Sequence, residues 1–343
     1  MSPFIMSALL MSLGLGTTIT FMSSNWIMAW LGLEINTLAI IPLMTKYHHP
    51  RATEAATKYF LTQASASALL LFSGIMKAWL TGDWNIFNSS DLLSSITLTM
   101  AIALKLGLAP THFWLPEVMQ GLDLVTGLIL ATWQKLAPFI LMIQITNPNN
   151  YSLIVFLGLL STLAGGWGGL NQTQLRKILA YSSIAHLGWT MVILPFSTKL
   201  AMLYIFLYIM MTSALFLILK LMDSTSINLM SISWTKAPLL MALTSMILLS
   251  LGGLPPLTGF IPKWLILQEL SNNNLNLLAL LMAISALLSL FFYLRLCYSA
   301  TLTTPPNINN NYQWRSTQNS HPLFSPILII SVLFLPITPS LVM

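Results

Sequence analysis

An apolar segment near residues 93–120 is interrupted by Gly107-Leu108-Ala109-Pro110 and then by Leu115-Pro116. A second apolar segment, near residues 237–271, is interrupted in the same way by Gly253-Leu254-Pro255-Pro256 and Ile261-Pro262. Glycine, leucine and both prolines match at a constant offset. Because proline lacks a backbone donor and ends or kinks a helix, the pattern predicts two broken helices, near 104–117 and 250–263.

The composition identifies lipid as the solvent around most of the chain. Of the 343 residues, 56% are hydrophobic and 6% are charged, whereas soluble domains carry about 25% charged residues. The 14 Lys and Arg residues are scattered singly, which excludes the basic patch expected of a nucleic-acid-binding protein. The single cysteine, Cys297, excludes a disulfide framework, a cysteine-ligated zinc site and an iron-sulfur cluster held by this chain alone. No metal site is predicted.

The fold class is therefore all-α and polytopic. A membrane helix needs about 20 apolar residues, and turn or polar clusters divide the chain into about eleven such segments. They lie near 3–22, 25–44, 56–80, 93–120, 124–146, 150–170, 177–195, 199–222, 237–271, 275–301 and 323–342.

The two broken segments are the fourth and the ninth, five crossings apart, so they should run in opposite directions. This is typical of inverted repeats in secondary transporters, whose ion sites lie where the helices unwind. The expected halves are 1–146 and 147–301, followed by a loop and a last helix in 302–343. The alternative is that both breaks reflect the general abundance of proline and glycine in membrane helices.

Loop charges predict the orientation. Most Lys and Arg residues, Lys46, Arg51 and Lys58 among them, fall on the side of the N-terminus, and Lys77 and Lys199 fall on the other. The positive-inside rule places the N-terminus on the side that is not translocated, and an odd number of spans places the C-terminus opposite. The first 45 residues hold no Lys or Arg, which favours synthesis inside a bacterium or an organelle over import with a presequence.

Four ionisable residues fall near the middle of predicted spans: Glu34, Lys105, Lys135 and Lys263. Each such charge costs about 2.5 to 3.5 kcal/mol to insert, so the four together cost on the order of 10 kcal/mol, comparable with the net stability of a protein. Burial lowers the pKa of a lysine and a nearby carboxylate raises it. Lysines balanced in this way can load and release a proton, which favours a proton relay over a purely structural role.

Other polar residues extend this interpretation. Glu34 is the acid nearest the centre of a span and the obvious partner for one lysine, although a structural ion pair remains the alternative. Proline breaks free backbone carbonyls that can bind an ammonium or water. His186 is a candidate relay residue or, equally, an interhelical hydrogen-bond donor. His112, beside the first break, is a weaker candidate of the same kind.

Several longer motifs resemble the NADH dehydrogenase subunit 2 family, the mitochondrially encoded, antiporter-like subunits of respiratory complex I. The resemblance covers nearly the whole chain. It rests on Leu104–Pro110, His112–Glu117, Thr132-Trp133-Gln134-Lys135-Leu136-Ala137-Pro138, Asn171–Ser183 and Leu251–Phe260.

The resemblance implies a proton-translocating module in the membrane arm, with Glu34 and Lys105 as a coupling pair, Lys135 as the central relay and Lys263 near the exit. It implies the mitochondrial inner membrane, with the N-terminus in the matrix and the C-terminus in the intermembrane space. The implied partners are other membrane-arm and accessory subunits and the lipid bilayer, with cardiolipin as a candidate lipid. NADH, FMN, iron-sulfur clusters and ubiquinone are expected on other subunits, so no cofactor is expected on this chain.

Two other functions share these features. A free-standing cation/proton antiporter would have the same repeat and buried lysines, and an inert structural subunit would tolerate their substitution. The resemblance also departs from the bacterial relatives, because three N-terminal helices of their fourteen-helix pattern are expected to be missing.

Overall fold

The computed structural model describes residues 2–86, 92–146 and 150–302, together with residues 326, 328, 329 and 331; for residues 235 and 236 it describes the backbone alone. Within these ranges every regular element is an α-helix, which confirms the all-α prediction. Contacts divide the chain into two compact units, Met1–Ser161 and Thr162–Met343. The expected repeat boundaries stay a prediction.

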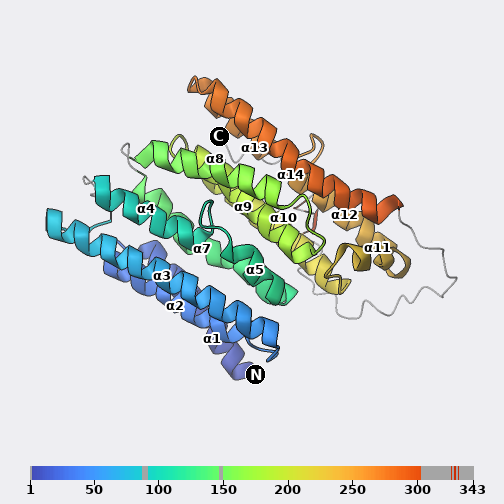
Figure 1. Cartoon of the computed structure of the whole chain (residues 1–343), viewed down its shortest axis with the longest axis horizontal. Helices are drawn as coiled ribbons and strands as arrows, with labels where there is room; N and C mark the ends of the chain where they lie inside the picture. Colours follow the sequence, from blue (N-terminus) through green and yellow to red (C-terminus); the bar gives the residue numbers. More distant parts are fainter. Residues whose placement is uncertain are drawn as a thin grey trace. The chain divides into compact units, whose positions relative to one another are not determined.

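The helices of the first unit, coloured blue to green in Figure 1, are α1 (Pro3–Met22), α2 (Trp26–Met44), α3 (Pro50–Thr81), α4 (Leu92–Leu106), α5 (Trp114–Gly121), α6 (Leu124–Ala131) and α7 (Trp133–Ile145). Helix α8 (Tyr151–Gly168) crosses the boundary between the units. The second unit contains α9 (Leu175–Ile193), α10 (Thr198–Leu221), α11 (Ile227–Lys236), α12 (Pro238–Gly252), α13 (Phe260–Asn272) and α14 (Asn276–Leu302).

Seven helical segments among the described residues are long and apolar enough to cross a membrane, with α6 and α7 counted together as one. The predicted spans near 93–120 and 237–271 are shorter helices because each is broken, and the span near 177–195 is α9. The last predicted span, 323–342, lies outside the described residues apart from four positions. The chain is thus a multi-pass membrane protein.

Both predicted breaks are observed, and both begin with the same backbone turn. Gly107 has φ 76° and Gly253 has φ 82°, a left-handed conformation that glycine adopts without steric cost. The following leucine N–H reaches back to the last helical turn, from Leu108 to the Ala103 carbonyl at 3.0 Å and from Leu254 to the Leu249 carbonyl at 3.3 Å. This is the glycine-dependent way of ending a helix, which explains why the Gly-Leu pair recurs.

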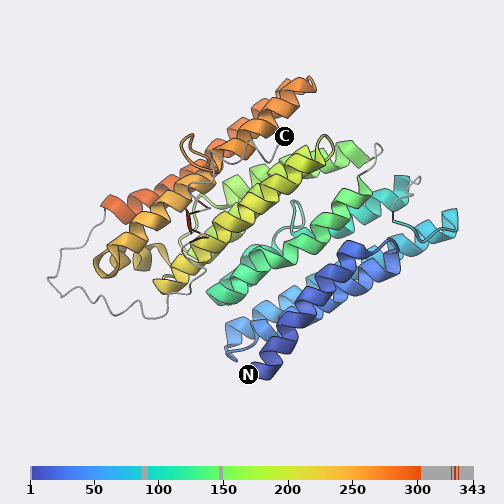
Figure 2. The ribbon, with the colours of Figure 1, turned by 180° about the vertical axis from the view of Figure 1, so that it is seen from behind.

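Helices α1, α2 and α3 lie side by side in the first unit (Figures 1 and 2). Glycines permit the close approach of α1 and α2, because a Cβ added to Gly16 would lie 2.8 Å from the Gly32 carbonyl oxygen. In the second unit, a Cβ on Gly165 would lie 2.6 Å from the Ala185 nitrogen of α9. Small residues therefore set the spacing of neighbouring helices, as is common in membranes.

The surroundings of Lys77 differ from those of a charge in an exposed loop. Lys77, assigned above to the loop charges, is fully buried in the last turns of α3. Helix α3 continues to Thr81, and the chain then turns back at Gly82. The Lys77 ammonium donates to the carbonyls of Asn85 and Ile86 in the returning segment. The segment that follows the helix therefore covers the lysine.

Candidate functional site

The first unit contains a small, partly enclosed cavity lined by residues of the helices from α2 to α7. Its volume is about 20 Å³, enough for about one water molecule. The predicted residues Lys105 and Lys135 both line it, although they come from different helices. Its polar lining consists of Asn36, Thr37, Tyr59, Gln63, Lys105, Gln134 and Lys135.

Lys105 lies in the last turn of α4, directly before Gly107. Its side chain is 6% exposed, and its ammonium has no hydrogen-bond partner among the described residues. A buried ammonium is costly unless it is paired or hydrated. The cavity beside it has room for one water molecule, which would hydrate the amine.

Glu34 is half-buried in α2 and makes no direct ion pair with Lys105 within the described part of the chain. Its carboxylate instead accepts a hydrogen bond from the Thr37 hydroxyl at 3.0 Å. Thr37, which binds this carboxylate, lines the same cavity as Lys105 and Tyr59. The structure therefore places Glu34 and Lys105 near the same cavity, and any electrostatic interaction between them acts without a direct ion pair.

Lys135 is buried at a third helix interruption, which the sequence analysis did not predict. The span from 124 to 145 is divided at Thr132, between α6 and α7, three residues before Lys135. Pro138 lies inside α7, and a proline removes the helical hydrogen bond to the carbonyl four residues earlier, here that of Gln134. The motif Thr132–Pro138 therefore loosens the backbone at the lysine.

Lys263 lies in the first turn of α13, directly after the second break. Its ammonium donates to the carbonyls of Gly252 at 3.0 Å and Leu251 at 3.3 Å. In a continuous helix these carbonyls would accept from residues 255 and 256, which are both prolines without an N–H. The expectation that a proline break supplies carbonyls to an ammonium is met at this site. The Trp189 ring of α9 lies 6.0 Å from the same nitrogen.

His186 is buried in α9 and hydrogen-bonded through both ring nitrogens. Nδ1 lies 2.9 Å from the Tyr204 hydroxyl, and Nε2 lies 3.4 Å from the Tyr293 hydroxyl. The partners come from α10 and α14, so the histidine joins three helices of the second unit. This fits the interhelical alternative and leaves a relay role open.

His112 lies in the first break and belongs to the first unit. Its ring contacts that of Phe113, with centroids 4.3 Å apart and ring planes tilted by 31°, and it donates a hydrogen bond to the Pro110 carbonyl. Neither contact reaches Lys105, and His112 is not among the residues that line the cavity. The described contacts give it a local role in the break.

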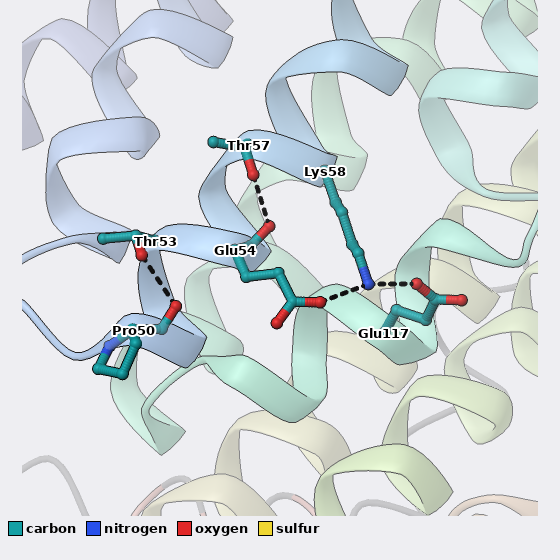
Figure 3. Close-up of polar contacts among 6 residues, drawn as sticks. All are labelled: Pro50, Thr53, Glu54, Thr57, Lys58 and Glu117. Carbon is teal, nitrogen blue, oxygen red and sulfur yellow. Dashed lines mark hydrogen bonds and ion pairs between the residues drawn. The ribbon is translucent and has the colours of Figure 1, made fainter.

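The residue aligned with Lys263 in the first half is Glu117, and it faces a different environment. Figure 3 shows Glu117 of α5 and Glu54 of α3 on either side of the Lys58 ammonium. The ion-pair distances are 2.9 Å and 2.8 Å, and all three side chains are well exposed. The first break is instead closed by Trp114, whose indole donates to the Leu104 carbonyl at 3.2 Å. The two breaks thus have the same backbone conformation, but different polar side chains bind their free carbonyls.

Tyr59 and Gln63 are cavity residues that the sequence analysis missed. Both lie on α3, are buried, and stand one turn apart on the face toward Lys105. Gln63 is a polar residue in the middle of an apolar span, and this pattern could have identified it as a candidate site residue. Among the described residues, no group of His, Cys, Asp and Glu could hold a metal ion.

Comparisons with known proteins identify the class. The family model described as "NADH:quinone oxidoreductase/Mrp antiporter, TM" matches residues 23–289, and that of the "NADH dehydrogenase subunit 2 C-terminus" matches residues 290–342. A chain of Thermus thermophilus respiratory complex I is 26% identical, with a TM-score of 0.87 over 100% of this chain and 80% of that one. A chain of the Mrp complex from Dietzia, 17% identical, shows the same fold with a TM-score of 0.80 over 89% of this chain and 62% of that one. The class is that of the antiporter-like membrane subunits.

A full-length relative gives the particular family. NADH-ubiquinone oxidoreductase chain 2 of Salmo salar is 60% identical over 344 residues, which cover 99% of this chain and 98% of the relative. The chain belongs to the NADH-ubiquinone oxidoreductase chain 2 family.

Proposed function

We propose that this chain carries protons across the membrane through Lys105, Lys135 and Lys263, as one subunit of a complex I assembly. The observation that carries the proposal is the shared cavity of Lys105 and Lys135, in which one ammonium has no protein partner among the described residues. Two amines beside one water-sized space can exchange a proton through that water. A structural role alone would favour amines held by fixed acceptors.

Each residue then has a distinct role. Lys105 and Lys135 exchange a proton in the first unit, and Glu34, which makes no direct ion pair with Lys105, tunes that lysine electrostatically. Lys263 holds its proton against two carbonyls in the second unit. Moving one charge against the membrane potential costs about 2.3 kcal/mol per 100 mV. The free energy for moving protons must therefore come from redox chemistry in partner subunits.

The surroundings of the chain follow from the same proposal. We place it in the mitochondrial inner membrane with its N-terminus in the matrix, because the relatives are NADH-ubiquinone oxidoreductase chains and loop charges favour that side. Other membrane-arm subunits and lipid, including cardiolipin, would surround it. NADH, FMN, iron-sulfur clusters and ubiquinone would sit on other subunits, and the single thiol of this chain, Cys297, is too few to hold an iron-sulfur cluster.

The test replaces Lys135 by alanine in the assembled complex. We expect proton uptake into vesicles per NADH oxidised to fall, while the amount of assembled complex stays unchanged. Lys199→Ala is the matched control, because Lys199 is exposed in the first turn of α10. Normal pumping by the Lys135→Ala complex would overturn the proposal.

The same measurements separate the other two functions. Proton-cation exchange by the purified chain alone in liposomes would indicate a free-standing antiporter. Unchanged turnover after substitution of Lys105 and Lys263 would indicate an inert structural subunit.

A further inference from the structure

Three successive residues at the start of α7 face three different neighbours in the first unit. The Trp133 indole N–H donates to the Leu13 carbonyl of α1 at 3.5 Å. The Gln134 amide N–H donates to the Asn36 carbonyl of α2 at 3.3 Å. Lys135, the next residue, is buried and lines the cavity described above. The first turn of α7 is therefore held from two sides directly before the lysine.

The backbone of this turn is held weakly by its own hydrogen bonds. The first N–H groups of a helix have no acceptor in a preceding turn, and α6 ends at Ala131. The Lys135 N–H donates to the Thr132 carbonyl at 3.3 Å, a bond of the 3₁₀ type. Pro138 supplies no N–H to the Gln134 carbonyl. The side-chain bonds to α1 and α2 therefore have a larger share in fixing this turn than they would have inside a regular helix.

Contacts with two different helices fix the rotation of the turn about its axis. Successive side chains of an α-helix are about 100° apart around that axis. With Trp133 bound to α1 and Gln134 bound to α2, the next side chain is turned by one further step. That step directs Lys135 to the cavity that Gln63 of α3 and Lys105 of α4 also line. A rotation of the turn would move the lysine amine away from this cavity.

We propose that Gln134 is a positioning residue for Lys135. Its N–H bond to the Asn36 carbonyl holds the first turn of α7 at the rotation that directs the lysine amine to the cavity. Gln134 passes no proton itself, because a carboxamide does not titrate near neutral pH. This inference rests on the proposed function, because it concerns the lysine that exchanges a proton with Lys105.

Gln134→Met in the assembled complex tests the inference. Methionine has nearly the same length and volume but no N–H donor. The contribution of this chain is measured as the part of proton uptake per NADH oxidised that Lys135→Ala abolishes. We expect Gln134→Met to lower that part about 10-fold, because a misplacement of about 1 Å can cost about 10²-fold in rate. Gln144→Met is the matched control, since Gln144 is half-buried on the same helix and does not line the cavity.

Gln134→His separates positioning from packing. The imidazole Nε2–H can reach about as far from the backbone as the glutamine amide, so it can donate to the Asn36 carbonyl. We therefore expect Gln134→His to keep most of the proton uptake that Gln134→Met loses. Equal losses in these two variants would show that the donor does not position Lys135. Normal pumping by Gln134→Met would overturn the inference directly.

Trp133→Phe provides a second test if Gln134→Met does not assemble in native electrophoresis. It removes the other N–H bond of the same turn, from a side chain that is 43% exposed, and should lower the same part of proton uptake. Normal pumping by Trp133→Phe would then overturn the inference.

The Lys135→Ala complex distinguishes this inference from the proposed function. Normal pumping by Lys135→Ala would overturn the proposed function. Loss of pumping by Lys135→Ala together with normal pumping by Gln134→Met would overturn the positioning role alone.

Discussion

Replacement of Gly253 by alanine tests the geometry of the second break. Gly253 has φ 82°, and a non-glycine residue in this left-handed region costs about 1 to 2 kcal/mol. The added Cβ would also lie 3.0 Å from Lys263 Cδ and 3.1 Å from Nζ. The lysine side chain must shift to relieve this contact, which displaces its ammonium from the Gly252 and Leu251 carbonyls.

Gly82→Ala is the matched control because it has the same backbone cost without the contact. Gly82 has φ 77°, and a Cβ there would meet nothing within 4 Å. We expect both variants to lower the thermal stability of the assembled complex by a similar amount, about 1 to 2 kcal/mol. Only Gly253→Ala should also lower proton uptake per NADH oxidised. Equal pumping by the two variants would refute the argument that the Lys263 contact matters.

Two further substitutions test packing and exposed charge. Gly165→Ala would place a Cβ 2.6 Å from the Ala185 nitrogen, so it should destabilise the complex by about 1 to 3 kcal/mol in thermal unfolding. The control, Gly14→Ala, has nothing within 4 Å of its added Cβ and should be neutral or slightly stabilising. Equal effects of the two substitutions would contradict the close packing at Gly165. Glu117→Gln should leave proton uptake nearly unchanged, because Lys58 keeps its 2.8 Å ion pair with Glu54 and exposed ion pairs contribute little. Lys263→Gln, at the aligned position, should lower proton uptake. A strong effect of Glu117→Gln on proton uptake would contradict this prediction.

Local backbone features were predictable from the sequence because they depend on glycine and proline. A left-handed glycine ends a helix and a proline removes a donor wherever they occur, so the breaks at Gly107 and Gly253 required no knowledge of neighbours. The same reasoning anticipated that carbonyls at a break would bind an ammonium, as Lys263 does. Composition and apolar length also predicted the seven long apolar helical segments of the described residues.

Contacts between helices were not predictable in the same way. Spacing along the chain says nothing about which side chains meet, so Tyr59 and Gln63 were missed as cavity residues. The burial of Lys77 was not predicted either, because a later loop covers it. The direct ion pair suggested by Glu34 and Lys105 is absent from the described structure, where Thr37 binds the carboxylate. A carboxylate in a helix can be satisfied by its own helix, and sequence alone does not reveal that competition.

The two breaks also show how one backbone device can support different chemistry. Each begins with a left-handed glycine and a leucine that returns to the last turn, so both expose carbonyls at the end of a helix. In the first, an indole from Trp114 binds one carbonyl, and the aligned acid, Glu117, pairs outward with Lys58. In the second, Lys263 itself binds the carbonyls. An indole N–H cannot release its proton near neutral pH, whereas an ammonium can, so of these two carbonyl-binding groups only Lys263 can exchange a proton.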